Sequence, residues 1–219
     1  MPDGNFMLKL IPVFLLLLAS CSAGNLESRH SSDLESRRIR RIAVLPPVNS
    51  GAPRPRVGTP PGEPRPPDRD PDEILARLLY PALSALPNWQ IVSESEAREA
   101  SQDISGADEA TRLRRLGEAV YADAVLVGRM SRYRERVGDE WGAKSPASVS
   151  FVLSLVDVRR GDVIWSANFD ETQKSLSENI FVIGSIGERG VRWLSADQLA
   201  NDGVKRAVGQ LHQLIGRVS

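Results

Sequence analysis

The chain has 219 residues, with 28 basic and 28 acidic side chains, 41% hydrophobic residues and a single cysteine. This length fits one domain with additions and is too short for two full domains of ordinary size. A formal charge of zero lacks the positive excess with which nucleic-acid-binding proteins neutralise phosphates, so we expect no nucleic-acid partner. One cysteine cannot form an internal disulfide, a Cys-x-x-Cys metal site or a redox pair.

An apolar run at residues 10–18 follows Lys9 and stops just before the single cysteine. Nine residues are too few to span a bilayer, which needs about 20, so we predict a signal peptide at residues 1–20. The basic start that is typical of a signal peptide is interrupted by Asp3. We therefore expect translation to begin at Met7.

The sequence Leu18-Ala19-Ser20-Cys21 resembles the lipobox of bacterial lipoproteins, in which an aliphatic residue and two small residues precede the acylated cysteine. The resemblance implies cleavage between Ser20 and Cys21 and lipidation of Cys21, including palmitate. Each buried acyl methylene contributes about 0.8 kcal/mol, so two or three chains anchor a domain firmly. The next residue is Ser22 and not Asp, which by the same resemblance implies the outer membrane. An ordinary signal peptide with a chance cysteine is the alternative.

Residues 21–38 contain few side chains that a core would bury, so we expect a flexible tether that follows the lipidated cysteine. A single periplasmic domain then covers residues 39–219. The arginines at the junction have two interpretations, a solvated strand edge or a contact with anionic lipid phosphates. These arginines are Arg37, Arg38, Arg40 and Arg41.

A proline-rich loop is expected at residues 46–71, which hold ten of the 15 prolines. Proline lacks the backbone N–H that helices and central strands require, so neither forms there. Around this loop, apolar periodicity and N-cap residues such as Asp70 and Ser93 predict the first elements. In chain order these are a strand at 42–45, a helix after Asp70, a short strand at 89–92, a short helix after Ser93, a helix within 106–121 and a strand at 124–135.

Two segments of strict alternation, residues 148–157 and 163–171, predict a β-hairpin. In the second segment Val163 and Trp165 share the apolar face with residues 167 and 169. The turn contains Arg160-Gly161-Asp162, which matches an integrin-binding tripeptide. Gly-Asp is also typical of tight turns, and we interpret it as a turn.

The last predicted element is a helix whose apolar stripe runs through residues 200–215. Ser195 and Gln198 have the spacing of a capping box at its start. Gly203 and Gly209 lie inside the helix, and each costs it about 1 kcal/mol of stability relative to alanine.

Parallel crossovers in the first half and an antiparallel meander in the second half indicate the fold class. We predict an α/β (α+β) domain with one mixed sheet and helices packed on it, preceded by the lipoprotein signal peptide and the tether.

Three strand segments, residues 42–46, 122–128 and 163–165, resemble those of periplasmic lipoproteins with an anticodon-binding-domain-like fold. This group includes the LpoB-type activators of penicillin-binding proteins, the curli-secretion lipoprotein CsgG and the amino-terminal domain of TolB. The resemblance covers about residues 39–171 and implies the same fold. Segments within residues 133–179 also resemble a group of uncharacterised lipoproteins. That second resemblance implies no activity.

Candidates for catalysis are few. Of the two histidines, His30 lies in the predicted tether and His212 on the last helix, so no Ser-His-Asp arrangement is evident. Asp139 and Glu140 are adjacent carboxylates in a polar turn, where solvation is the more common role. We therefore predict no catalytic, cofactor-binding or metal-binding residues, and no cofactor.

The leading functional hypothesis is a non-enzymatic, lipid-anchored protein of the outer membrane that faces the periplasm and binds another envelope component. A first alternative is a homo-oligomeric secretion or assembly ring like the curli channel. A second alternative is an envelope hydrolase that uses Asp139 and Glu140.

Overall fold

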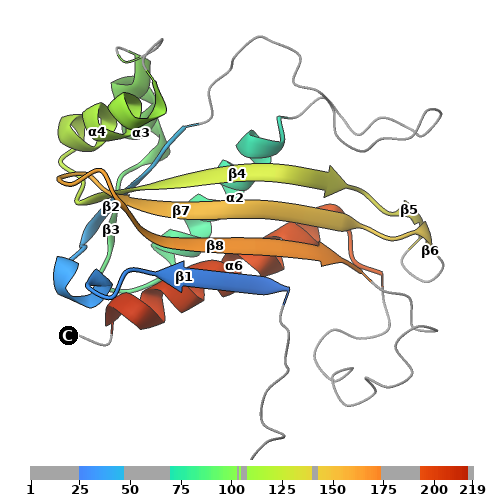
Figure 1. The fold of residues 1–219 in the computed structure, drawn as a ribbon. Helices are drawn as coiled ribbons and strands as arrows, with labels where there is room; N and C mark the ends of the chain where they lie inside the picture. Colours follow the sequence, from blue (N-terminus) through green and yellow to red (C-terminus); the bar gives the residue numbers. More distant parts are fainter. Residues whose placement is uncertain are drawn as a thin grey trace, which may run out of the picture.

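The structure is a computed structural model that describes residues 25–46, 70–102, 104, 108–139, 143–173 and 193–216. It contains a six-stranded sheet in the order β1-β8-β7-β4-β2-β3 and a separate two-stranded sheet of β5 and β6 (Figure 1). The strands are β1 (Leu26–His30), β2 (Arg41–Val44), β3 (Gln90–Ile91), β4 (Ala124–Arg134), β5 (Val137–Gly138), β6 (Ala143–Ser145), β7 (Ser148–Asp157) and β8 (Val163–Thr172). The helices are η1 (Leu34–Arg37), α2 (Pro71–Ser84), α3 (Glu94–Gln102), α4 (Glu109–Ala119) and α6 (Ala196–Gly216).

The main sheet is mixed, which confirms the predicted fold class. Strand β2 runs parallel to both β3 and β4, while β4, β7, β8 and β1 are successively antiparallel. Helices link the parallel strands because a parallel connection needs a crossover of a dozen or more residues. The hairpin predicted for the second half is β7 and β8.

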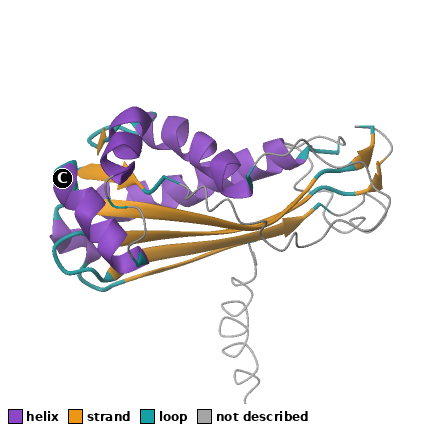
Figure 2. Cartoon of the chain, turned by 90° about the horizontal axis from the view of Figure 1, so that it is seen from above, coloured by secondary structure: helices purple, strands orange, loops and turns teal. Residues whose placement is uncertain are grey.

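Helices lie on both faces of the sheet, and Figure 2 shows the strands between them. On one face α2 and α6 cover β4, β7 and β8, and the core here contains Phe151, Trp165 and Phe169. On the other face α3 and α4 pack over β2 and β4 through residues such as Leu116 and Val125. Within the described residues this second layer is shorter, and α3 and α4 leave much of the β7–β8 hairpin uncovered.

The amino-terminal segment differs from the prediction. Residues 26–30 form β1, which pairs antiparallel with β8 and completes one edge of the sheet. The 3-10 helix η1 then buries Leu34, which is 1% exposed. Residues 25–38 are therefore part of the domain, which was expected to begin at residue 39, and the flexible tether predicted for 21–38 is wrong from residue 25 onward. The tether was predicted because this segment has few side chains that a core would bury. An edge strand also buries few side chains, since backbone hydrogen bonds stabilise it.

The predicted helix starts are confirmed in their atomic detail. The Asp70 carboxylate accepts the N–H of Asp72 at 3.0 Å, with Pro71 at the first helical position. Ser195 and Gln198 accept each other's backbone N–H at 3.2 and 2.9 Å, which is a complete capping box. The signal peptide, Cys21 and most of the proline-rich loop, at 47–69, lie outside the described residues.

Candidate functional site

An apolar groove lies between α4 and the β7–β8 hairpin, on the partly covered face of the sheet. Its volume is about 390 Å³. Valines from β4, β7 and β8 form its floor, and residues of α4 form one wall. Two of the floor residues are exposed to solvent, Val152 at 39% and Val163 at 56%. Clustered apolar side chains in a concave site are typical of a binding surface.

Two local features shape this groove. A Cβ atom on Gly117 would lie 2.3 Å from Cγ2 of Val158, so the glycine allows α4 to approach the turn after β7 closely. The register between the hairpin strands shifts after Leu155, so that Val156 pairs with Val163 and both line the groove. The shift explains an error in the sequence prediction, which placed Val163 on the apolar face with Trp165.

The charged side chains at the rim are paired. The Arg129 guanidinium forms an ion pair with Glu109 and lies 4.0 Å from the buried carboxylate of Asp72. On the outer side of α4, Arg114 lies 4.0 Å from Glu118. Because each cation has a carboxylate beside it, the rim adds little net charge to the apolar floor. The groove therefore favours a neutral, aliphatic ligand.

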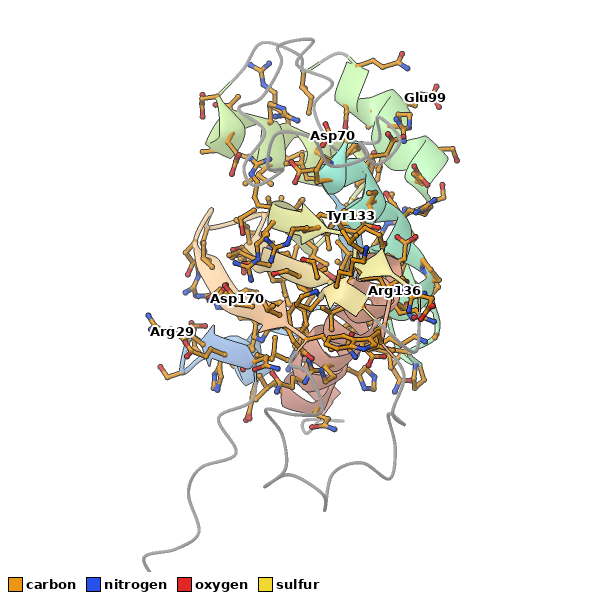
Figure 3. All side chains as sticks on the ribbon, turned by 90° about the vertical axis from the view of Figure 1, so that its right-hand side faces the viewer. Arg29, Asp70, Glu99, Tyr133, Arg136 and Asp170 are labelled. Atoms are coloured by element: carbon orange, nitrogen blue, oxygen red, sulfur yellow. The ribbon has the colours of Figure 1, made fainter. Side chains whose placement is uncertain are left out.

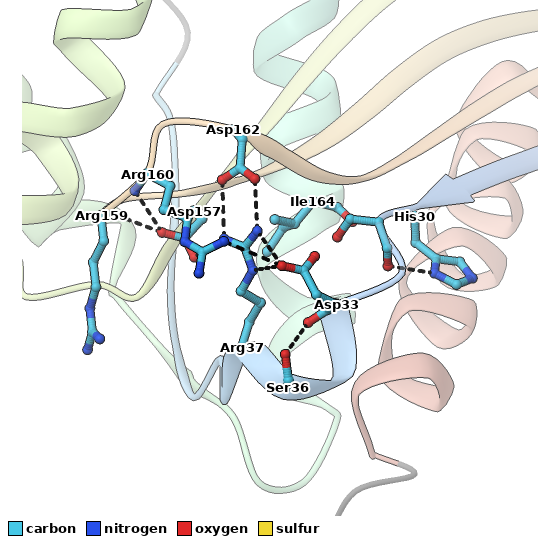
Figure 4. Close-up of polar contacts among 10 residues, drawn as sticks. His30, Asp33, Ser36, Arg37, Asp157, Arg159, Arg160, Asp162 and Ile164 are labelled. Atoms are coloured by element: carbon cyan, nitrogen blue, oxygen red, sulfur yellow. Dashed lines mark hydrogen bonds and ion pairs between the residues drawn. The ribbon is translucent and has the colours of Figure 1, made fainter.

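A network centred on Arg37 fixes one end of the groove (Figure 4). The Arg37 side chain is 7% exposed and donates to Asp157 at 2.8 Å and to Asp162 at 2.9 Å. It also donates to Asp33 at 3.0 Å. The network thus ties η1 to both ends of the turn between β7 and β8.

The same turn is held from within. The Asp157 carboxylate accepts the backbone N–H groups of Arg159 and Arg160 at 2.8 and 3.1 Å. Gly161 has a φ of 72°, a left-handed conformation that glycine adopts without strain. These contacts confirm the turn interpretation of the Arg-Gly-Asp sequence, because its Asp162 side chain is bound to Arg37.

The charges of the network are mutually stabilised. Hydrogen bonds to Asp162 and Asp157 raise the pKa of Arg37 above its ordinary value. Burial opposes the charged form of Asp157, but the hydrogen bonds from Arg37, Arg160 and Arg159 outweigh it and lower the pKa of Asp157. The charged forms of Arg37 and Asp157 are therefore both favoured by their contact.

The contacts of the two histidines do not indicate a catalytic role. His30 lies on the exposed edge strand β1, and not in a tether, with Nδ1 3.1 Å from the carbonyl oxygen of Ser31. His212 lies on α6, with Nε2 3.1 Å from the carbonyl oxygen of Pro87 and its ring edge-on to Trp89. Both contacts are ones that a surface histidine makes.

The other predicted candidates are only partly described. Asp139 is an exposed residue that follows β5, while Glu140 lies outside the described residues, so their pairing stays a prediction. Ser20 and Cys21 also lie outside, so cleavage and lipidation stay predictions. Within the described ranges, no group of three or more His, Cys, Asp or Glu side chains has the arrangement of a metal site. No helix in those ranges is long and apolar enough to cross a bilayer.

Sequence reasoning missed the groove, although one signal was present. Val152 interrupts the row of serines at 148, 150 and 154 that otherwise makes one face of β7 polar. A single apolar residue on a polar face is common and does not by itself indicate a binding surface. Val152 indicates one only because it lies near α4 in the fold.

Comparisons with known proteins found only distant similarities. No protein-family model and no curated protein matches the chain. Among solved structures, the PelC dodecamer from Paraburkholderia phytofirmans matches with 14% identity and a TM-score of 0.43 over 85% of this chain and 95% of that chain. Lipoprotein GNA1162 from Neisseria meningitidis matches with 20% identity and a TM-score of 0.39 over 68% and 91%.

The LpoB carboxy-terminal domain from Salmonella enterica matches with 15% identity and a TM-score of 0.37 over 61% of this chain and 83% of that chain. LpoB-type lipoproteins, which the strand segments resembled in sequence, are thus among the structural neighbours. Likenesses at this level do not transfer function from one protein to another.

Proposed function

We propose that this protein is a lipid-anchored envelope protein of the outer membrane, which faces the periplasm and binds another envelope protein without catalysing a reaction. The observation that carries the proposal is the groove between α4 and the hairpin, with Val152 and Val163 exposed on its floor. The anchor rests on the lipobox-like sequence that ends at Cys21.

The occupant of the groove is a short peptide segment with two or three aliphatic side chains. A volume of about 390 Å³ accommodates a few side chains but no folded element of any size. The floor is mostly valine, with Ser154 as its one hydroxyl among the described lining residues, and a rim of paired charges offers little net attraction for an ion. Apolar burial is therefore the main source of affinity, at about 25 cal/mol per Å².

The anchor is tested by replacing Cys21 with alanine. The variant is expected to leave the membrane fraction and to lose palmitate labelling, because it lacks the acylated thiol. A variant that keeps both properties contradicts the proposed anchor.

The groove is tested in cells with a photoreactive amino acid at Val163. We expect one dominant cross-linked envelope protein, and we expect Val152→Asp in the same chain to abolish the adduct because a charge on the floor opposes apolar burial. The same photoreactive residue at Tyr121, which is 87% exposed outside the groove, is the matched control. An adduct that survives Val152→Asp, or that forms equally from position 121, contradicts the proposal.

A homo-oligomeric ring is the second candidate function, and one feature favours it. Within the described part of the chain β1 pairs only with β8, so its outer edge has backbone groups that a strand of a second copy can bind. Self-adducts at position 163, together with elution of the detergent-extracted protein as a large ring, would support this candidate over the first.

A further inference from the structure

We infer that the end of the sheet where β1 begins lies against the anionic phospholipid head groups of the membrane, with Arg134, Arg136 and Lys144 as the contacting side chains. This inference rests on the proposed lipidation of Cys21. It adds to the proposed function an orientation of the domain on the membrane, a second binding surface and the chemistry of the ligand at that surface.

The length of the chain places one end of the sheet beside the membrane. The backbone carbonyl of Asn25 accepts the N–H of Asp170 at 3.0 Å, so Asn25 is part of the sheet. Four residue steps separate it from Cys21, and an extended chain covers at most about 3.6 Å in each. Asn25 therefore lies no more than about 14 Å from an acylated Cys21. The 17-residue tether expected from the sequence would have allowed the domain to tumble freely.

The register of the sheet identifies the side chains at this end. Arg132 lies opposite Ser150, which lies opposite Asp170, so this row of residues ends at Asn25. The next row outward contains Tyr133, Val149 and Glu171, and the row after it contains Arg134, Ser148 and Thr172. The small β5–β6 sheet, which carries Lys144, continues beyond it (Figure 1).

Figure 3 looks onto this end, where Tyr133, Arg136 and Asp170 are labelled. Arg134, Arg136 and Lys144 thus lie farther along the sheet than Asn25, on the side of the anchor. A domain held at Asn25 presents these side chains first to a surface at that end.

Among the described residues, the charges at this end are unbalanced. Arg132 is paired with Asp170, and the Glu135 carboxylate accepts the first N–H of α6 from Ala196 at 3.1 Å. Arg134, Arg136 and Lys144 form no ion pair with any carboxylate in the described part of the chain. The exposed Asp139 offsets one of these three charges. Basic side chains that are held close to a bilayer by another anchor are attracted to anionic head groups.

The opposite end of the sheet is unsuited to this contact. The arginines considered as lipid ligands from the sequence lie there, at the far end of β1 and beyond. Arg37 is enclosed by three carboxylates and Arg41 is paired with Glu96. Val163 lies six residues along β8 from Phe169, or about 20 Å. The Val163 end of the groove is therefore the end farther from the membrane, where a periplasmic partner can reach it, while Val152, opposite Asn168, lies nearer to the membrane.

The orientation is tested with the full lipidated protein in vesicles that contain phosphatidylglycerol and a lipid with a nitroxide on its head group. A fluorophore is attached through Thr172→Cys at the proposed contact end or through Arg159→Cys in the turn at the other end. Cys21 is acylated, so the introduced thiol reacts alone. The two positions are about 30 Å apart along β8, so we expect quenching about threefold or more stronger at position 172.

The head-group contact is tested by removing its charges. Arg134→Gln with Lys144→Gln should lower quenching at position 172 about twofold in phosphatidylglycerol vesicles, because fewer cations hold that end to the surface. The matched control, Arg38→Gln with Arg40→Gln, should leave quenching unchanged. Vesicles of phosphatidylcholine alone should reproduce the effect of the first pair.

The outcomes separate the two proposals. If mass spectrometry shows that Cys21 carries no acyl chains, the proposed anchor fails and the orientation fails with it. If Cys21 is acylated but quenching is equal at both positions or stronger at 159, only the orientation is overturned. If position 172 is quenched but neither the charge variants nor the neutral vesicles change it, the head-group contact is overturned.

Discussion

The two glycines inside α6 provide a sharp test of the packing. On helix propensity alone, Gly203 and Gly209 are equivalent, and alanine at either position should stabilise the helix by about 0.5–1 kcal/mol. The surroundings of the two positions are different. A Cβ atom at position 209 would meet nothing within 4 Å, whereas one at position 203 would lie 2.8 Å from Cε1 and Cζ of Phe169.

The ring of Phe169 has little room to move away. It is fully buried and stacks on Phe151 with ring centres 4.9 Å apart. The guanidinium of Arg206 lies 5.1 Å from the centre of the same ring, and it also binds Glu171 at 2.9 Å. Overpacking a core in this way costs about 1–3 kcal/mol. Gly203→Ala should therefore lower the free energy of unfolding by up to about 2 kcal/mol after the helix gain is subtracted.

Urea unfolding followed by circular dichroism, on chains that start at Ser22, measures both substitutions. Gly209→Ala should raise the free energy of unfolding by about 0.5–1 kcal/mol, so the two variants differ by about 1–3 kcal/mol. For a domain of this size that difference corresponds to about 2–12 °C in Tm. If Gly203→Ala stabilises the protein as much as Gly209→Ala does, α6 does not pack on Phe169 as described.

Two further predictions concern the amino-terminal segment. Leu34→Ala should lower the free energy of unfolding by about 2–5 kcal/mol, while Glu35→Ala on the exposed side of η1 should change it by less than about 0.5 kcal/mol. Equal, small effects of both substitutions in urea unfolding would show that this segment is a flexible tether after all. Because the pKa of Asp157 is lowered in the folded state, its contribution to stability is complete above pH ~4 and is lost as the pH falls through the lower folded value. The free energy of unfolding should therefore fall less steeply between about pH 4 and pH 2 in Asp157→Asn than in the parent chain, and parallel slopes would show that Arg37 does not stabilise the Asp157 carboxylate.

Much of the fold could be predicted because the relevant signals are local. Asp70 followed by Pro71 specifies a helix start, because the Asp70 side chain accepts a backbone N–H and Pro71 has no N–H that would need a partner. The structure contains that cap. The alternation across residues 148–157 specifies which side chains of β7 enter the core, and Phe151 is fully buried as expected. In both cases the residues that carry the signal are within a few positions of the structure they determine.

The features that escaped prediction depend on distant partners. Leu26 joins a strand because Phe169 lies opposite it, 143 positions later, and nothing in residues 26–30 reports that partner. Val163 changes its surroundings because the register of β8 against β7 shifts between Trp165 and Val163, opposite Leu155 and Val156. Arg37 looks like one more solvated arginine in the sequence, yet three carboxylates from two segments surround it.

The sequence by itself determined the mixed sheet, the helix starts and the lipidation proposed at Cys21, because periodicity, caps and a short cleavage motif are read over a few neighbouring residues. Only the tertiary structure decided where the domain begins, because pairing of β1 with β8 is a contact across most of the chain. It also decided that a groove exists between α4 and the β7–β8 hairpin. A binding surface forms where particular elements pack side by side, and the whole fold determines which elements do so.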